Sequence, residues 1–262
     1  MARGFAGAPP RVLGHRGAAG LAPENTLVSF HRGRAEGADV LELDVHATAD
    51  GEVVVLHDAT LDRTTEGSGA VRERPWDEVR RLDAGFRFTP DGGRTFPYRG
   101  QGVTIPRLAD LMTALPAMPL NIEVKQGDPP IVGAVIALVR GARAPVVLAA
   151  EHDAIMLAIR AAAPDLPTSL AAGEVAAFHD AVEHGRAPAL PPSVVALQIP
   201  PRFGDIELVT AASVGAAHAA GVEMHVWTIN DPAEIHRLLD LGVDGIVSDF
   251  PARVRTALDG RT

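Results

Sequence analysis

The stretch VLELDVHATADGEVVVLHD, from Val40 to Asp58, decides the fold of this chain. Its first half alternates strictly, with Glu42 and Asp44 on one face and apolar residues on the other, which is typical of a strand with one polar face. The tripeptide ADG then makes a turn into a second apolar run that ends at His57. Because three residues are too few for a parallel crossover, we expect an antiparallel hairpin with Asp44 roughly opposite His57.

Strand and helix patterns alternate along most of the remaining chain. With the returning strand of the hairpin set aside, eight parallel strands are predicted, and eight strand–helix units in about 250 residues are typical of a closed barrel. A doubly wound sheet is the alternative, but no glycine-rich dinucleotide motif follows the first strand. We therefore predict an α/β protein with a single (β/α)8 TIM-barrel catalytic domain over residues 1–262. The predicted barrel strands are Arg11–Gly14, the first half of the quoted stretch, Pro119–Lys125, Pro145–Ala149, Thr168–Ala171, Val194–Ile199, Val222–Thr228 and Gly245–Ser248.

Two other segments carry predictions of their own. Between Ala59 and Thr104 the periodicity breaks down among glycines and prolines, with one short helix expected around Trp76 to Leu82. About 46 residues are too many for a plain loop, so we predict a small inserted subdomain over residues 59–104, after the hairpin of the second strand. Further along, the pattern predicts a helix from Ile206 to Ala220.

Composition limits the possible partners and compartments. The chain of 262 residues has a net charge of −9, which argues against nucleic acid or an anionic membrane as a general partner. It has no cysteine, and therefore no disulfide and no thiol nucleophile. The longest apolar run, Ile131 to Val139, is too short to span a bilayer, and the N-terminus lacks a signal-peptide pattern. We expect a cytoplasmic enzyme without membrane insertion, and the sequence is compatible with a homo-oligomer.

In a TIM barrel the active site lies at the C-terminal ends of the strands, and chemically useful side chains of this chain fall at that rim. The carboxylates of Glu42, Asp44 and Glu123 would repel each other without a cation between them, and such oxygen donors suit Mg²⁺ or Ca²⁺. The alternative is a structural ion-pair layer in which Glu123 pairs with Lys125, about 7 Å along the same strand face. The opposite face of that strand, Ile122 and Val124, should pack against helices.

Two histidines and two cations follow the same strands. His15 and His57 are candidates for a general acid and base, because histidine titrates near neutral pH. Arg16 and Lys125 could hold a phosphate, or could simply balance the carboxylates. Each of these residues also has a purely structural explanation. The histidines could be hydrogen-bonded structural residues, Trp227 could fill the core, and Asp249 could cap the last helix. Of the other histidines, His46 and His225 could face the barrel interior, and the five on predicted helices should lie at the surface.

Seven short motifs occur in an order that resembles a known family. They are HRG at His15, PENT at Pro23, ELD at Glu42, HD at His57, LDRTT at Leu61, EVK at Glu123 and WTIN at Trp227. Together they resemble the glycerophosphodiester phosphodiesterase family, of the PLC-like phosphodiesterase superfamily, from residue 12 to about residue 251. The resemblance implies a (β/α)8 barrel with an insertion after the HD strand. It also implies metal-dependent hydrolysis of glycerophosphodiesters to sn-glycerol 3-phosphate and an alcohol, in lipid and glycerol metabolism.

The resemblance also implies a role for each site residue. It makes Glu42, Asp44 and Glu123 ligands of Mg²⁺ or Ca²⁺, His15 and His57 the acid–base pair, and Arg16 and Lys125 the phosphate clamp. We expect Glu24 to orient Arg16, Asn25 to reach the metal or phosphate, Trp227 to contact substrate, and Gln198 to lie on the rim.

The nucleophile is open between water and the glycerol C2 hydroxyl, and the resemblance favours the hydroxyl and a cyclic phosphate. A lysophospholipase D or cyclising phospholipase on the same barrel is one alternative function, and an apolar groove on the rim would favour it. The sequence shows no strong exposed apolar stretch of that kind. A non-catalytic phosphate-binding barrel is the other alternative, and loss of a histidine or carboxylate would favour it. None of those residues is lost.

Overall fold

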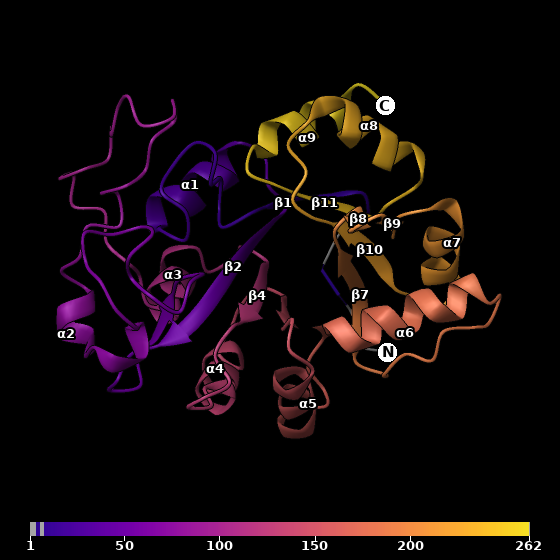
Figure 1. The fold of residues 1–262 in the computed structure, drawn as a ribbon, viewed down its shortest axis with the longest axis horizontal. Coiled ribbons are helices and arrows are strands. Elements are labelled where there is room, and N and C mark those ends of the chain that lie inside the picture. Colours follow the sequence, from indigo (N-terminus) through magenta and orange to yellow (C-terminus); the bar gives the residue numbers. More distant parts are fainter. Residues whose placement is uncertain (1–3, 6–7, 262) are drawn as a thin grey trace.

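The computed structural model describes residues 4–5 and 8–261, which form a closed barrel of eight parallel strands (Figure 1). The strand order is β1-β11-β10-β7-β6-β5-β4-β2, and pairing of β1 with β2 closes the barrel. The predicted TIM barrel is therefore confirmed. Its strands are β1 (Arg11–Gly14), β2 (Val40–Ala47), β4 (Leu120–Val124), β5 (Val146–Ala149), β6 (Thr168–Ser169), β7 (Val194–Ile199), β10 (Glu223–Val226) and β11 (Gly245–Ser248).

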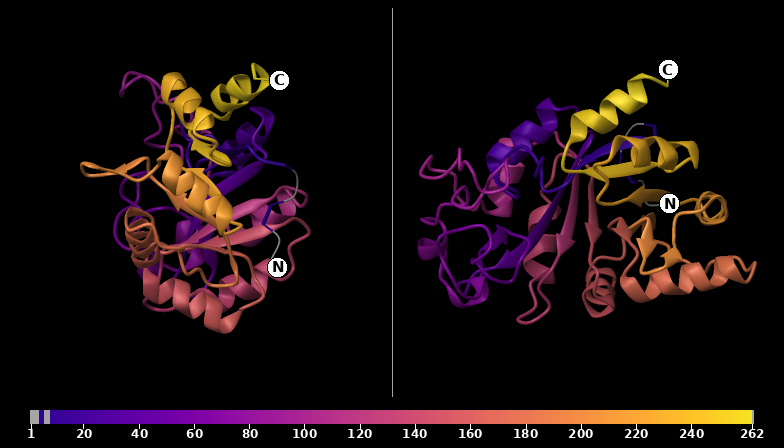
Figure 2. Two further views of the ribbon diagram at one scale, coloured as in Figure 1. Left: turned by 90° about the vertical axis from the view of Figure 1, so that its right-hand side faces the viewer. Right: turned by 45° about the horizontal axis from the view of Figure 1, so that its top comes forward.

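Helices between the strands cover the outside of the barrel (Figures 1 and 2). Some of them begin at a capping side chain: the Thr26 hydroxyl accepts from a backbone N–H of α1, and the Asp231 carboxylate does the same for α8. The inward stripe of α8 is Ile235, Leu238 and Leu239, at the spacing of one helix face. The helices are α1 (Leu27–Ala35), α2 (Trp76–Val79), α3 (Leu108–Ala114), α4 (Val132–Val139), α5 (Asp153–Ala162), α6 (Ala172–Glu183), α7 (Ala211–Ala219), α8 (Pro232–Asp240) and α9 (Pro251–Asp259), with a 3₁₀ turn η1 (Val71–Glu73).

The apolar core lies between the strands and these helices. Ile122 and Val124 of β4 are fully buried in one cluster with side chains of α3, α4 and α5, as the alternation of β4 predicted. A second cluster joins β10 and β11 to α7, α8 and α9. Each such buried side chain contributes about 1.5–3 kcal/mol to stability. The polar face of the strands is therefore left for the barrel interior.

That interior is polar below the rim. His225 is fully buried, with Nε2 2.9 Å from Glu223 and Nδ1 3.3 Å from the amide of Gln198. The same amide donates to Asn121 at 3.1 Å. The expected inward position of His225 is thus confirmed. The Gln198 amide therefore contacts the buried polar side chains of Asn121 and His225.

The hairpin forms with its register one residue from the expected one. Strand β3 (Val53–Val55) pairs antiparallel with β2, Val45 opposite Val55, and the Leu56 N–H donates to the Asp44 carbonyl at 2.9 Å. Asp44 therefore lies opposite Leu56, and His57 is the first residue beyond the ladder. Because His57 is not paired in the sheet, the direction of its side chain is not set by the in–out alternation of strand residues.

Residues 56–107 lead from β3 to α3 and occupy one end of the molecule, at the left of Figure 1. The short helix expected here is α2, which ends at Val79, three residues earlier than predicted. A small apolar cluster separate from the two barrel clusters holds this segment together. It consists of Val54, Leu56, Leu61, Val71, Val79, Ala84, Val103 and Ile105. The delimitation of a subdomain at residues 59–104 stays a prediction.

The helix predicted from Ile206 to Ala220 begins too early. Residues 202–207 instead form a small hairpin of β8 (Arg202–Phe203) and β9 (Ile206–Glu207). Gly204, with φ of 58°, supplies the left-handed conformation that a two-residue hairpin turn requires. The hairpin stands out from the body of the molecule (Figure 2, left), and Thr210 then caps α7. Within the described residues, every helix is too short or too polar to cross a membrane.

Candidate active site

The three predicted metal ligands come together at the C-terminal ends of β2 and β4. Asp44 lies in register with Glu123 on the neighbouring parallel strand, and Glu42 is two residues back on the same face. One carboxylate oxygen from each lies within 4.8 Å of the others. Glu42 and Asp44 are 7% and 1% exposed, so their charges are almost removed from water. Three acids in so small a volume need compensation.

Two cations supply part of that compensation. The Nζ atom of Lys125 is 2.7 Å from Glu123 and 3.3 Å from Asp44. The Nε atom of Arg16 is 3.3 Å from Asp44; it is buried, and its N–H is not aligned on any acceptor among the described residues. The backbone N–H of Arg16 donates to Glu42 at 2.9 Å. The Glu123–Lys125 ion pair of the structural alternative does form, but the lysine also reaches Asp44.

The donor set fits a divalent cation. Oxygen-only ligands at this spacing suit Mg²⁺ or Ca²⁺. Burial, and next the neighbouring charge of Asp44, raise the pKa of Glu42 to about 7. Protons and metal ions compete for the same carboxylate oxygens, and a divalent charge there would favour the ionised form. The geometry therefore agrees with the predicted metal site.

A strained loop carries the residues that flank this cluster. Arg16 and Asn25 have φ of 47° and 56°, a left-handed conformation that residues other than glycine seldom adopt. The Asn25 N–H donates to the Arg16 carbonyl at 3.0 Å, and the Asn25 amide donates to Asp44 at 2.9 Å. Glu24 accepts from Arg16 Nη1 at 2.7 Å, which is the contact expected of a residue that orients Arg16. Asn25 thus touches a predicted ligand, and its role toward metal or phosphate stays a prediction.

Each candidate catalytic histidine is held by a carboxylate. His15 Nδ1 lies 2.6 Å from Asp249, whose other oxygen accepts from the Asn230 amide at 2.6 Å. His57 Nδ1 lies 2.6 Å from Asp58. Within the described residues the Nε2 atom of neither histidine has a hydrogen-bond partner. A carboxylate on Nδ1 fixes the ring and leaves Nε2 available for proton transfer.

The charges around His15 change its titration. Burial alone would lower its pKa, but the hydrogen bond that His15 donates to Asp249 and the negative charge of Glu42 outweigh burial, so the pKa of His15 is raised. The same contact with His15 and the Asn230 amide lower the pKa of Asp249, against the effect of burial. At neutral pH His15 is therefore more readily protonated than a free histidine.

Sequence reasoning missed four residues of this site. Asp58, Arg63 and Asn230 stand inside the HD, LDRTT and WTIN motifs, but no role was drawn from those letters. Asp249 was considered as a helix cap, and this alternative is wrong, because Phe250 occupies the cap of α9 and Asp249 contacts His15. For Asp58, Arg63 and Asn230 the available signal was motif membership. Asp249 lies outside the seven motifs, and its contact with His15 spans 234 residues.

The remaining candidates lie at the rim. Trp227, just beyond β10, is 43% exposed, so the core-filling alternative is wrong for it. His46 is buried, and its Nε2 lies 3.0 Å from the backbone carbonyl of His57. Phe203 and Ile206 of the β8–β9 hairpin are 73% and 50% exposed, so this side of the barrel presents large apolar side chains to solvent.

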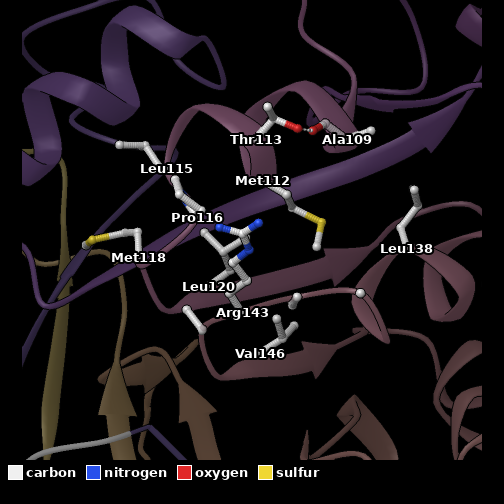
Figure 3. Close-up of a pocket in the computed structure, with 13 residues that line it drawn as sticks. Ala109, Met112, Thr113, Leu115, Pro116, Met118, Leu120, Leu138, Arg143 and Val146 are labelled. Atoms are coloured by element: carbon white, nitrogen blue, oxygen red, sulfur yellow. Dashed lines mark hydrogen bonds between the residues drawn. The ribbon is translucent and has the colours of Figure 1, made fainter.

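A sizeable cavity lies away from the acidic cluster. It has a volume of about 500 Å³ between α3 and α4 and is lined by residues such as Met112, Leu138 and Arg143 (Figure 3). Leu120 and Val146, the first residues of β4 and β5, form part of its wall. It is therefore at the N-terminal end of the barrel, opposite the acidic cluster, and does not serve as the active site.

The chain is similar to several known proteins. The sequence profile described as "Glycerophosphoryl diester phosphodiesterase family" matches residues 15–253. A probable glycerophosphodiester phosphodiesterase 2 of Mycobacterium tuberculosis is 32% identical, over 95% of this chain and 91% of its own length. A crystal structure of a putative glycerophosphoryl diester phosphodiesterase from Silicibacter pomeroyi has a TM-score of 0.77 at 31% identity, covering 98% and 95% of the two chains.

A phosphodiesterase of Oleispira antarctica, solved in complex with the product sn-glycerol-3-phosphate, has a TM-score of 0.76 at 26% identity, over 96% of this chain and 97% of its own. The family profile spans most of the chain and reaches from His15, in the first motif, to beyond the last barrel strand. The chain therefore belongs to the glycerophosphoryl diester phosphodiesterase family and is a phosphoric diester hydrolase.

Proposed function

We propose that this chain hydrolyses glycerophosphodiesters to sn-glycerol 3-phosphate and an alcohol by metal-dependent histidine acid–base catalysis. The observation that carries this proposal is the acidic cluster of Glu42, Asp44 and Glu123 with Arg16 and Lys125 against it. The product bound to the Oleispira antarctica relative supports the same glycerol phosphate moiety in the substrate.

Arg16 and Lys125 bind the phosphodiester. A guanidinium and an ammonium both donate to phosphate oxygens, and both side chains here already face oxygen anions. Glu42, Asp44 and Glu123 would hold a Mg²⁺ or Ca²⁺ ion, which supplies further neutralisation of the charge that develops on the phosphate oxygens. Glu24 keeps Arg16 directed at the cluster, and Trp227 lies at the rim where the rest of the substrate would extend.

His15 and His57 move the protons. The raised pKa of His15 favours its protonated form, so we assign it as the acid that protonates the departing alkoxide. His57, held through Nδ1 by Asp58, accepts the proton of the nucleophile at Nε2. If the nucleophile is the glycerol C2 hydroxyl, its attack on phosphorus releases the alcohol and leaves a cyclic phosphate, which water then opens to glycerol phosphate. If it is water, the products form in one displacement.

One observation favours a second substrate class. The exposed Phe203 and Ile206 beside the barrel, with Trp227 at the rim, present the apolar surface that a single acyl chain would contact. The alternative of a lysophospholipase D activity on the same site therefore gains a structural argument that the sequence did not supply.

The decisive experiment measures release of sn-glycerol 3-phosphate from glycerophosphocholine and glycerophosphoethanolamine, and of lysophosphatidic acid and choline from lysophosphatidylcholine, with and without EDTA. Turnover of the first two, abolished by EDTA and restored by Mg²⁺ or Ca²⁺, is the expected result. Activity confined to the lysophospholipid would replace the first substrate class with the second. A chain inactive on all three with either metal would overturn the proposal.

A further inference from the structure

Arg63 connects two parts of the site that are distant in sequence. Its Nε and Nη2 atoms donate to the two oxygens of Asp58, at 2.6 and 3.1 Å. Its Nη1 and Nη2 atoms donate to the two oxygens of Glu24, at 2.6 and 2.8 Å. All three nitrogens of one guanidinium are therefore used in two bidentate pairs, the geometry that gives arginine–carboxylate contacts their directionality.

Each of these carboxylates holds a proposed catalytic group. The other contact of Asp58 is His57 Nδ1 at 2.6 Å, and the other contact of Glu24 is Arg16 Nη1 at 2.7 Å. An unbroken series of hydrogen bonds thus runs from the proposed base to the proposed phosphate ligand, with Arg63 in the middle.

The ordinary explanation is a surface ion-pair network. Arg63 is 45% exposed, and exposed ion pairs contribute little to stability. Two observations distinguish it from such pairs. Its acceptors are only 19% and 28% exposed, and Glu24 lies 39 residues away, whereas the exposed pair Arg80–Asp77 spans a single helical turn.

Titration of the two carboxylates agrees with strong coupling. Arg63 is the main cause that lowers the pKa of Asp58 to about 2, against partial burial and with help from His57. Burial would raise the pKa of Glu24, but Arg63 and Arg16 outweigh it and lower the pKa to about 2. Both carboxylates therefore stay ionised at any pH where the site could work.

We infer that Arg63 is a positioning residue that fixes His57 and Arg16 relative to each other by clamping Asp58 and Glu24. The inference rests on the proposed function, because it gives those two groups their tasks. A lysine could not replace Arg63, since one ammonium cannot make two bidentate pairs in a plane. The segment at residues 59–104 would then contribute to catalysis through this one side chain.

The kinetic test compares Arg63→Ala and Arg63→Lys with a matched control, Arg80→Ala, on glycerophosphocholine. Displacement of a catalytic group by about 1 Å can cost a hundredfold in rate, so we expect kcat/KM of both Arg63 variants to fall roughly ten- to a hundredfold. Misplacement of His57 should lower kcat, and misplacement of Arg16 should raise KM. Arg80→Ala should keep parental kinetics, and circular dichroism should show folded protein in all cases.

Two further measurements separate positioning from general stability. Because Arg63 is half exposed, millimolar guanidinium should restore part of the activity of Arg63→Ala, whereas methylammonium should not. In a double-variant cycle, Asp58→Asn combined with Arg63→Ala should lose less than the sum of the two single losses. Additive losses and no rescue would overturn the inference.

A readout independent of turnover separates this inference from the proposed function. Histidine ring ¹⁵N shifts should show the proton of neutral His57 on Nδ1 in the parent and a mixture of tautomers in Arg63→Ala. Calorimetry should show weaker binding of sn-glycerol 3-phosphate to the variant. An unchanged tautomer in the variant would overturn the positioning role even if turnover fell. A parent that neither binds nor releases glycerol phosphate, but whose His57 tautomer depends on Arg63, would overturn the proposed function and support the clamp.

Discussion

Replacing Lys125 by arginine tests whether the site needs a compact cation. Of the 24 basic residues in the chain, 23 are arginine and Lys125 is the single lysine. Its Nζ atom bridges two carboxylates, 2.7 Å from Glu123 and 3.3 Å from Asp44, and the side chain is mostly buried. A guanidinium is broader, planar and forked, so in this space it would engage Glu123 through two nitrogens or displace it.

The expected loss follows from these contacts. A hydrogen bond to a charged group contributes about 1.5–3 kcal/mol, so losing the correct contact with one phosphate oxygen should cost roughly tenfold or more in kcat/KM. We therefore expect Lys125→Arg to fold and to lose at least about tenfold, which is about 1.4 kcal/mol of transition-state stabilisation. Lys125→Met should lose more, because the charge itself is removed.

Steady-state kinetics on glycerophosphocholine measure both variants, with circular dichroism as the control for folding. Arg140→Lys is a matched control for the exchange of the two cations, because Arg140 makes an exposed ion pair with Asp165 far from the site. A Lys125→Arg variant as active as the parent would refute the reasoning and make the solitary lysine an accident of composition.

Three other outcomes follow from the geometry. Glu42→Gln and Asp44→Asn should each weaken binding of Mg²⁺ or Ca²⁺ and lower activity greatly, which metal titration and kinetics would check; full activity in excess chelator after dialysis would contradict it. Asp249→Asn should lower the raised pKa of His15. A proton donor loses its proton as pH rises through its pKa, so the basic limb of the pH–rate profile should move to lower pH. An unmoved limb would show that His15 is not the donor. Phe203→Ser should raise KM for lysophosphatidylcholine and leave KM for glycerophosphocholine unchanged; equal effects on both would exclude the acyl-chain contact.

The barrel could be predicted because its signals are local and repeated. The alternation of Glu42 and Asp44 with apolar neighbours determines which side chains of β2 face inward, and the parallel register with Glu123 follows from the fold class. The same logic located the acidic cluster. It failed at residues 202–207, where the apolar Ile206 fitted a helical pattern but Gly204 allowed a two-residue turn. Turn chemistry outweighed periodicity there.

The residues that orient the site could not be predicted in the same way. Asp249 reaches His15 across 234 positions, and Arg63 reaches Glu24 across 39. Such contacts depend on where loops of different strands meet, and no period in the sequence encodes that meeting. The strained φ of Arg16 and Asn25 is likewise a product of tertiary contacts rather than of local preference.

The charges of the cluster also predict that metal and phosphate bind cooperatively. Without a divalent cation, Lys125 and Arg16 are engaged by Asp44 and Glu123, and turning them toward a phosphate would leave buried carboxylates uncompensated. With the carboxylates around a cation, both side chains are released for phosphate oxygens. Calorimetry should therefore show tighter binding of sn-glycerol 3-phosphate in Mg²⁺ or Ca²⁺ than in EDTA, and by linkage the product should tighten metal binding by the same factor. Equal affinities in the two conditions would mean that the two cations bind phosphate without leaving the acids, and that the cluster is the structural ion-pair layer.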